Sequence, residues 1–227
     1  MNLKILQELD KLLHTSPQLL RDQPKLRQAI NATFDVMLDD VSFSTLGEIV
    51  DRIDQAVLKK YFTQVWQPKT KKYKYSGLSL IDEINNLNPR SVLDLGCGYN
   101  EFKGKINNLV GVDPYNQNAD VISSIVGYRS KTKFDVIIVL GSINFGSTDT
   151  IFAELENAVG LLAPGGKLFA RVNPGLAHEP PESKWISFYP WTNTFILNTA
   201  EYFDLDILDM RYDSNDRMYF VWKKKDK

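Results

Sequence analysis

A short apolar run that ends in a glycine turn constrains this chain more than any other stretch. Residues 91–99 read SVLDLGCGY, and the run from Val92 to Leu95 has the length and composition of a buried strand. Gly96 and Gly98 allow backbone angles and a close ligand approach that a side chain would block. Ordinary strand turns share this pattern, so the stretch predicts a buried strand and makes the following turn a candidate ligand loop.

From residue 78 onward, helical and strand patterns alternate. Helices are expected at 78–87, 150–162 and 194–202, and strands at 92–95, 109–112, 121–122, 134–140, 167–172, 207–212 and 218–222. The apolar run FDVIIVL at 134–140 is typical of a parallel strand that is covered on both faces. The alternation predicts a three-layer α/β sheet whose last strand is antiparallel.

The first 66 residues have helical rather than strand periodicity. Apolar side chains at helical spacing predict one helix from Leu3 to His14, another from Pro24 to about Asp39 and a last one that continues to Tyr61. Between the first two, Ser16 and Pro17 have the character of an N-cap and a first helical position, which restarts the chain in a new direction. The helix from Pro24 should turn inward Leu26, Ile30, Phe34, Met37 and Leu38.

The helix that runs to Tyr61 has its own start signal. Thr45 and Glu48 form a capping box. The inward positions of this helix are Ile49, Ile53, Val57 and Tyr61. We interpret residues 1–66 as an N-terminal helical cap, which serves as a packing module or as a lid over the core that follows.

Residues 67–77 form a basic linker before that core. Four lysines lie among Tyr73 and Tyr75 in the sequence QPKTKKYKYSG. Basic residues interleaved with aromatic ones can follow a nucleic-acid backbone and stack on bases, although a solvated linker has the same composition. Tyr75 is therefore a candidate substrate contact, and both interpretations stay open.

Composition excludes several classes of function. The formal net charge is −1, which gives no general attraction to nucleic acid or to anionic membranes. No stretch has the length of a membrane span and the polar start lacks a secretory core, so we expect a cytoplasmic protein with no membrane partner. Cys97 is the only cysteine, and His14 and His178 are the only histidines. We therefore expect no intrachain disulfide and no metal site.

The turn after the first strand differs from a dinucleotide fingerprint. The third glycine of GxGxxG is missing, because Gly96 and Gly98 are followed by Tyr99, Asn100 and Glu101. A carboxylate at Glu101 would lie near the helix N-terminus that docks a pyrophosphate, which disfavours NAD. Asp113, at the end of the second strand, is placed to accept hydrogen bonds from ribose hydroxyls. The pattern favours a nucleoside ligand without a pyrophosphate.

Four segments together resemble the motifs of class I S-adenosylmethionine-dependent methyltransferases. They are VLDLGCG at 92–98, GVDP at 111–114, FDVIIVLGSINF at 134–145 and LLAPGGKLFARV at 161–172. The resemblance covers residues 78–227 and implies a Rossmann-like, seven-stranded, mostly parallel sheet that ends in a reversed hairpin. The crossovers after the first two strands are very short, so the domain is a compact variant of the fold that looks like bacteriophage members.

The resemblance also implies which residues bind S-adenosylmethionine, with S-adenosylhomocysteine as the product. Asp94 would lie near the ammonium group, Asp113 would hold the ribose, and Asn100 replaces the third glycine. Ser124 stands where the family often has an acid facing the adenine. The implied cofactor residues are Asp94, Gly96, Cys97, Gly98, Asp113, Pro114, Ser124, Ile125, Leu140, Gly141 and Ser142. Cys97 reads as a small apolar filler, not as a nucleophile.

Two regions offer substrate contacts. Asn144 follows the fourth strand but lacks the NPPY context of enzymes that methylate base amines, and it can equally be a turn residue. The long connection 173–193 contains His178, Trp185, Tyr189 and Trp191, where the aromatics could stack on an acceptor and the histidine could act as a base. Alternatively, the tryptophans fold back on the sheet and His178 is exposed to solvent.

We therefore expect a methyltransferase that acts on a nitrogen or oxygen atom of a small molecule. A dedicated base is optional, because positioning can supply much of the rate of this displacement, and the sequence identifies no catalytic residue. Two alternatives stay open. One is an RNA methyltransferase that uses the basic linker, and the other is a non-catalytic subunit that only binds S-adenosylmethionine.

Overall fold

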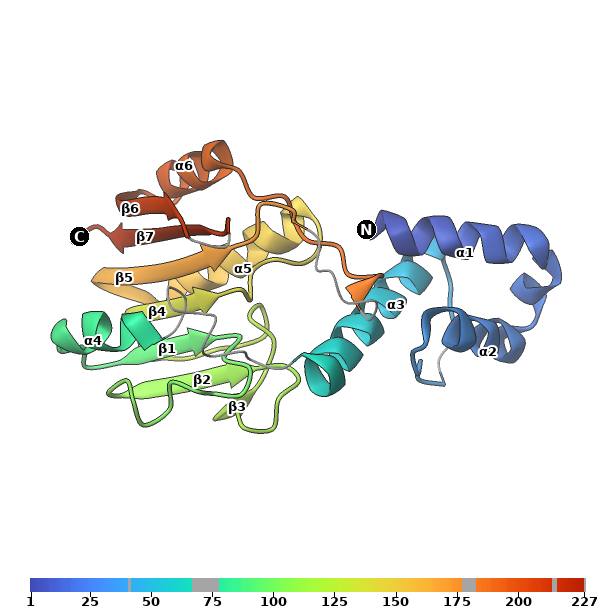
Figure 1. Ribbon diagram of the computed structural model, residues 1–227, viewed down its shortest axis with the longest axis horizontal. Coiled ribbons are helices and arrows are strands. Elements are labelled where there is room, and N and C mark those ends of the chain that lie inside the picture. The colour runs from blue at the N-terminus through green and yellow to red at the C-terminus, as the bar shows by residue number, and fades with distance from the viewer. Residues whose placement is uncertain (41, 67–77, 177–182, 214–215, 227) are drawn as a thin grey trace. The chain divides into compact units, whose positions relative to one another are not determined.

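The computed structural model describes residues 1–40, 42–66, 78–176, 183–213 and 216–226 (Figure 1). The chain divides into two compact units. One consists of Met1–Trp66 with Ala177–Ser187, and the other of Gln67–Leu176 with Phe188–Lys227. Among the described residues, no helix combines the length and the apolar composition that crossing a membrane requires.

The first unit is helical, as its periodicity predicts. Its elements are α1 (Leu3–Thr15), the 3₁₀ turn η1 (Pro17–Arg21), α2 (Gln23–Phe34), α3 (Leu46–Lys60) and the π-helical turn η2 (Tyr61–Val65). The expected inward positions of α3 are all buried. Thr45 caps α3 by accepting from the Glu48 amide at 3.1 Å, and the Glu48 carboxylate accepts from the Ser44 amide at 3.0 Å. These two hydrogen bonds confirm the capping box, except that Glu48 bonds to the amide of Ser44 and not to that of the cap residue Thr45.

The end of α2 differs from the prediction. The helix stops at Phe34 because Asp35 adopts a left-handed conformation, with φ 53°. Met37, which was expected to face inward, is 88% exposed, and Val36 is buried in its place. The helical spacing of the apolar residues continued past the point where the backbone leaves the helix.

A segment from the connection after the fifth strand packs with the helices. The Asn2 side chain donates to the Asp54 carboxylate and to the Trp185 carbonyl, each at 2.7 Å. The Trp185 ring lies 4.9 Å from the Phe34 ring, and Lys4 donates to the Ile186 carbonyl at 3.1 Å. Residues 183–187 are thus part of the helical unit, although they are far from it in the sequence.

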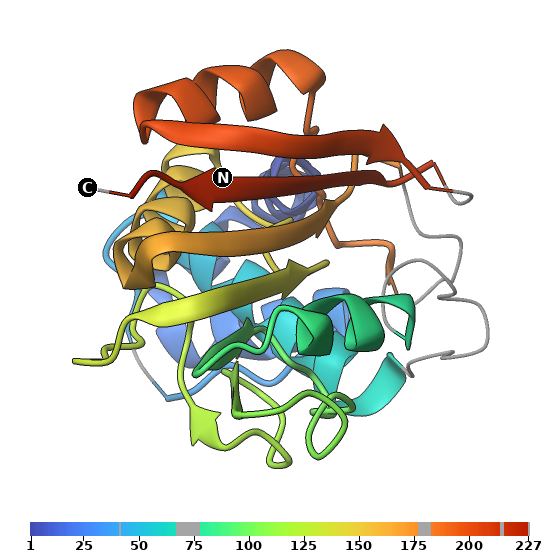
Figure 2. The same cartoon turned by 90° about the vertical axis from the view of Figure 1, so that its left-hand side faces the viewer.

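The second unit is a seven-stranded sheet in the order β3-β2-β1-β4-β5-β7-β6. Its strands are β1 (Val92–Leu95), β2 (Leu109–Asp113), β3 (Val121–Ile122), β4 (Phe134–Leu140), β5 (Leu162–Val172), β6 (Leu205–Tyr212) and β7 (Met218–Lys224). All neighbouring strands pair in parallel except β7, which is antiparallel to β5 and β6. Figure 2 shows β6, β7, β5 and β4 one beneath the other. This confirms the predicted sheet and its reversed strand.

Three helices cover the two faces of the sheet. Helix α4 (Leu78–Asn86) packs on the face that carries Val136 and Ile138 of β4. Helices α5 (Thr148–Leu161) and α6 (Asn193–Tyr202) pack on the other face, with Ile137 and Val139. Successive β4 side chains therefore enter opposite cores, which explains why this strand is a continuous apolar run.

Two boundaries in the sheet unit were predicted less well. Helix α5 begins at Thr148, two residues before the expected start, and its cap is Ser147, which accepts from the Thr150 amide at 3.3 Å. Strand β5 begins at Leu162 and not at the expected Lys167, so it includes the Pro-Gly-Gly sequence at 164–166. Gly165 has φ +71°, and the pairing with β4 shifts register there, so the glycines form an irregularity within the strand.

The connections that follow β1 and β2 are short, as predicted. Residues 96–108 form turns, and no helix connects β1 to β2 or β2 to β3. Glu101 therefore does not lie at a helix N-terminus, contrary to the prediction, because no helix begins there. Phe102 and Ile106 of this segment pack against the α4 side of the sheet, where a crossover helix would otherwise lie.

Candidate active site

The glycine turn after β1 lies at the carboxyl ends of the parallel strands. Gly96, Gly98 and Asn100 have φ values of 79°, 53° and 57°, all in the left-handed region. The amides of Gly96 and Cys97 both donate to the Val112 carbonyl, at 2.7 and 3.0 Å, so the turn is held against the end of β2. Open α/β sheets bind ligands at this edge. The asparagine takes a conformation that few other side chains tolerate.

The turn also meets the segment that follows β4. A Cβ atom built on Gly96 would lie 2.2 Å from the Ser142 Cβ, so only glycine fits there. Gly141 has φ +84° and donates its amide to the Arg171 carbonyl at 2.8 Å. The Ser142 Oγ is buried and has no hydrogen-bond partner among the described residues. The structure thus brings together Gly96, Gly141 and Ser142, three of the expected cofactor residues.

Asp94 supplies a buried carboxylate beneath this turn. It is 3% exposed, and no hydrogen bond or ion pair of its carboxylate is found among the described residues. Burial, with a smaller contribution from the nearby Asp113 charge, raises the pKa of Asp94 to about 7. A cationic group placed beside Asp94 would stabilise its ionised form.

Asp113 ties the glycine turn to the end of β2. One carboxylate oxygen accepts from the Gly98 amide at 3.0 Å, and the other accepts from the amides of Tyr115 and Asn116 at 2.8 and 2.9 Å. A carboxylate has roughly four acceptor sites, so about one is left for a ligand hydroxyl. Asp113 therefore holds the loop in shape and keeps an acceptor site that is not used by these three amides.

Polar side chains replace the missing crossover helix. Asn100 donates to the Asn118 carbonyl at 2.9 Å, and Asp120 accepts from the Gly111 amide at 2.8 Å. Lys103 lies 2.8 Å from Asp120. The pKa of Asp120 is lowered, because these hydrogen bonds and the Lys103 charge outweigh its partial desolvation. We had not predicted this cluster, and the short spacing between β1 and β3 was its only signal in the sequence.

Other expected cofactor residues lie around the same strands. Cys97 packs against Gly111, where a built Cβ would be 2.9 Å from its sulfur, and burial raises the pKa of its thiol. Ser124 is exposed, and its hydroxyl accepts from the Gly127 amide at 3.0 Å, while Ile125 enters the α5 side core. Pro114 directly follows β2, and Leu140 is the last residue of β4.

Asn144 is a buried structural residue in the loop after β4. Its side-chain oxygen accepts from the Asn173 amide at 2.8 Å, and its carbonyl accepts from the Tyr189 amide at 2.8 Å. Asn173 in turn accepts from the amides of Gly175 and Leu176, at 2.9 and 2.7 Å. These contacts favour the turn role that the sequence left open for Asn144.

The aromatic residues of the 173–193 connection divide between the two units. Trp191 is 1% exposed and donates its indole N–H to the Ile143 carbonyl at 2.9 Å. The half-buried Tyr189 packs edge-on against Trp191, with ring centroids 5.7 Å apart. Trp185 packs on Phe34 in the helical unit. Trp191 thus has the contacts of a core residue, which the sequence had left as an alternative.

We expect Trp191→Phe to lower stability while leaving ligand binding intact. The change removes the hydrogen bond to Ile143 and leaves a buried carbonyl unpaired, which costs about 1–3 kcal/mol. Denaturant unfolding measures this loss, and Tyr202→Phe, which alters an exposed aromatic, should change stability by less than about 0.5 kcal/mol. A Trp191→Phe protein of wild-type stability would show that the hydrogen bond contributes nothing.

Some predicted residues lie outside the described part of the chain. Tyr75 and the basic linker 67–77 are among them, and so is His178. Within the described ranges, no group of three His, Cys, Asp or Glu side chains is arranged to hold a metal ion.

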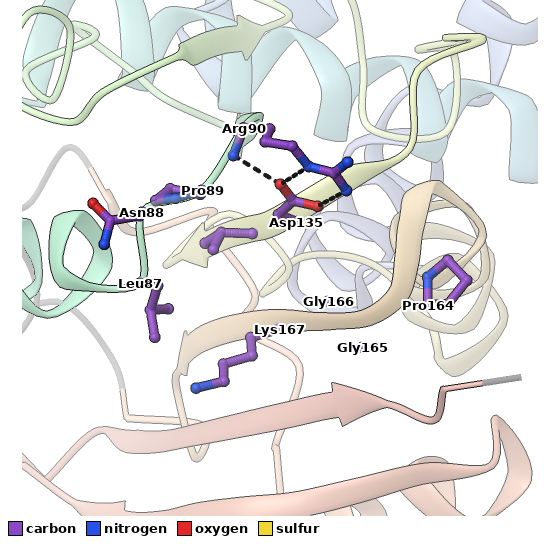
Figure 3. A pocket seen from close by; sticks show the side chains of 10 residues that line it. Leu87, Asn88, Pro89, Arg90, Asp135, Pro164, Gly165, Gly166 and Lys167 are labelled. Atoms are coloured by element: carbon purple, nitrogen blue, oxygen red, sulfur yellow. Dashed lines mark hydrogen bonds and ion pairs between the residues drawn. The ribbon is translucent and has the colours of Figure 1, made fainter.

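A separate depression of about 370 Å³ lies at the opposite edge of the sheet (Figure 3). It is lined by the turn before β1, the start of β4 and residues 164–167 of β5. Arg90 and Asp135 face each other there, with the Arg90 amide donating to the carboxylate at 2.7 Å. This depression is at the amino ends of the strands, so it is distinct from the glycine turn at their carboxyl ends.

Comparisons with known proteins place the fold. No protein-family model and no curated protein sequence matches the chain. A solved structure of Burkholderia thailandensis 1,6-didemethyltoxoflavin-N1-methyltransferase, with 1,6-didemethyltoxoflavin and S-adenosylhomocysteine bound, is similar over 84% of this chain and 95% of its own. The TM-score is 0.59 and the sequence identity is 14%.

Two further solved structures are similar. The N-methyltransferase NodS from Bradyrhizobium japonicum WM9, in complex with S-adenosylhomocysteine, matches 75% of this chain and 97% of its own, with TM-score 0.52 and 15% identity. An S-adenosylmethionine-dependent methyltransferase from Clostridium acetobutylicum ATCC 824 matches 64% and 89%, with TM-score 0.50 and 15% identity. With the observed strand order and glycine turn, these likenesses show that the chain has the fold of class I S-adenosylmethionine-dependent methyltransferases.

Proposed function

We propose that this protein transfers a methyl group from S-adenosylmethionine to a nitrogen or oxygen atom of a small molecule. The observation that carries the proposal is Asp94, a buried carboxylate without a counter-charge among the described residues, beneath a turn that only glycine can form. The α-ammonium group of the cofactor would supply the missing positive charge. A pyrophosphate ligand would instead bring negative charge toward Asp94, which is unfavourable.

The remaining residues of the site suit an adenosyl ligand. Asp113 retains about one acceptor site for a ribose hydroxyl, and Gly96 and Gly98 leave the backbone accessible to the methionine end. The buried Ser142 hydroxyl, next to Gly96, is a donor without a partner among the described residues. These groups fit a ligand with both cationic and hydroxyl groups.

The chemistry needs few catalytic groups from the protein. When bound, S-adenosylmethionine would supply a methyl group on a sulfonium, which an acceptor lone pair would take over while the carbon–sulfur electron pair stays on sulfur and the acceptor proton passes to solvent. Gly96 and Gly141 leave room for this approach, and the ties of Asp113 and Asn144 hold the two loops in place. The protein therefore acts mainly by orienting the reactants.

A small-molecule acceptor is supported by the similar structures and by charge. The Burkholderia enzyme was solved with a small-molecule acceptor bound. The net charge of −1 gives this chain no general attraction to RNA. A labelled-methyl assay against separated metabolite and RNA fractions tests the choice, and label in the RNA fraction alone would contradict it.

We expect S-adenosylhomocysteine and S-adenosylmethionine to stabilise the protein, and NAD to have no effect. A specific ligand at about 100 times its dissociation constant adds about 2.7 kcal/mol of stability. Thermal unfolding with each ligand measures this shift. A shift with NAD but with neither adenosyl ligand would show that the assignment of the cofactor is wrong.

A further inference from the structure

Asn100 closes the glycine turn and is buried, although its side chain is polar. It is 7% exposed, and its φ of 57° lies in the left-handed region. Its amide donates to the Cys97 carbonyl at 2.9 Å, and its own carbonyl accepts from the Lys103 amide at 3.1 Å. The main chain of Asn100 thus ends one tight turn and begins the next, so its side chain is attached where the backbone changes direction.

The Asn100 side chain is fastened to the connection between β2 and β3. Its Nδ2 donates to the Asn118 carbonyl at 2.9 Å and to the Asp120 carboxylate at 3.4 Å. Both partners are acceptors, so the amide nitrogen faces them and the amide oxygen must point away. The Asp120 carboxylate is itself held, because it accepts from the Gly111 amide at 2.8 Å. Asn100 is therefore anchored to groups that are bonded to β2.

This orientation presses the amide oxygen of Asn100 against β2. Oδ1 is buried, has no hydrogen-bond partner among the described residues, and would lie 2.4 Å from a Cβ atom built on Gly111. The same Cβ atom would lie 2.9 Å from the Cys97 sulfur. Two side chains of the turn thus pack on a strand position where no further side chain fits. An unpaired buried oxygen is costly, so the bonds of Nδ2 determine how the amide is turned.

We propose that Asn100 is a positioning residue, whose side chain keeps the turn in the shape that receives the methionine end of S-adenosylmethionine. This inference rests on the proposed function, and it adds a role for a side chain that points to the β2–β3 connection. Gly96 and Gly98, which are expected to line the methionine end, lie in the same turn. A turn that adopts the competent shape only part of the time lowers the affinity by that fraction.

The expected loss is confined to one end of the ligand. The ribose is expected at Asp113, whose carboxylate is also held by the amides of Tyr115 and Asn116, at 2.8 and 2.9 Å. These two bonds do not involve the glycine turn. Loosening Asn100 should therefore weaken the binding of the amino-acid part of the ligand and leave the nucleoside part bound.

The test compares two ligands on the full-length protein. S-adenosylhomocysteine has both ends of the ligand, whereas 5′-methylthioadenosine lacks the amino-acid group. Calorimetric titration measures the first dissociation constant, and saturation-transfer NMR measures the second, both well below the melting temperature. Asn100→Asp keeps the shape of the side chain but replaces the donor by an acceptor that faces Asp120. We expect this variant to bind S-adenosylhomocysteine at least about tenfold more weakly, and 5′-methylthioadenosine within about twofold of wild type.

Three further variants separate fastening from added charge. Gln117→Glu makes the same change of amide to carboxylate at an exposed position of the β2–β3 connection, and should leave both dissociation constants within about twofold. Gly111→Ala adds no charge but places a methyl group against the Asn100 oxygen, and should weaken S-adenosylhomocysteine selectively. Asn100→Gly keeps the left-handed backbone without strain and removes the fastening, so it should have the same selective effect.

The two ligands and the control distinguish failure of this inference from failure of the proposed function. If S-adenosylhomocysteine binds wild type, and the Asn100 and Gly111 variants bind it within twofold, Asn100 does not position the turn and the proposed function stands. Equal losses for both ligands would show a general structural role, and would contradict the inference. So would an equal loss in Gln117→Glu, or a wild type that does not bind 5′-methylthioadenosine. Failure of S-adenosylhomocysteine to bind wild type would instead contradict the proposed function. Thermal unfolding shows which variants are folded.

Discussion

Gly96→Ala is expected to abolish the binding of S-adenosylhomocysteine and to destabilise the protein. The new methyl group would lie 2.2 Å from the Ser142 Cβ, and Gly96 has φ +79°. A non-glycine residue in the left-handed region costs about 1–2 kcal/mol, and overpacking adds about 1–3 kcal/mol. We therefore expect a loss of about 2–5 kcal/mol in the free energy of unfolding. Denaturant unfolding and calorimetric titration measure the two effects.

Two variants separate the clash from the backbone strain. Gly104 lies in the same crossover with φ +75°, and a Cβ built there has no heavy atom within 4 Å. Gly104→Ala should therefore cost only the strain and leave ligand binding unchanged. Adding Ser142→Gly to Gly96→Ala removes the clashing atom and should recover part of the stability. If Gly96→Ala binds S-adenosylhomocysteine within twofold of wild type, the turn is not the cofactor site.

Asp94→Asn is expected to stabilise the ligand-free protein at pH 8 and to weaken S-adenosylhomocysteine binding. The native pKa of Asp94 is about 7, above the value of about 3.9 in an unfolded chain, so the native state binds more protons between these values. The contribution of Asp94 to wild-type stability therefore falls as the pH rises from about 4 to about 7. The asparagine variant lacks this fall, so its melting temperature should exceed that of wild type at pH 8.

The effect on binding has the opposite sign. An ionised Asp94 attracts the ammonium group, so wild-type affinity should rise with pH up to about 7 and then level off. We expect Asp94→Asn to lose at least about tenfold in affinity at pH 8, or about 1.4 kcal/mol, and to lose this pH dependence. Asp39→Asn, at an exposed site, serves as the control. Equal affinities of the Asp94→Asn protein and wild type at pH 8 would exclude the ammonium contact.

The sequence was informative where periodicity and glycine positions determine structure. The apolar run 134–140 and the turn at Gly96 predicted the positions of β4 and β1, and Asp113 was correctly placed at the end of β2. The absence of a helix between β2 and β3 followed from spacing alone, whereas spacing still allowed a very short or irregular helix between β1 and β2, where the structure has turns. These features depend on local pattern and chain length, which a single sequence contains.

Other features depend on long-range contacts that the sequence does not display. Met37 continues a helical pattern, but the backbone leaves the helix at Asp35. Trp191 and Asn144 are residue types that often contact ligands. In the structure, however, both hold loops together through partners that lie far away in the sequence. The sequence therefore identifies the chemical type of each side chain but not the group with which each polar side chain forms its hydrogen bonds.

The turns between β1 and β2 affect how this part of the site can open. A helix loses its hydrogen bonds cooperatively, whereas this segment is fastened by separate ties from Asn100, Lys103 and Asp120. Each tie can break without the others, so local opening requires less than the global free energy of unfolding. The Lys103–Asp120 pair is partly exposed and is screened by salt. The cost of opening the loop beside Gly98 thus depends on ionic strength.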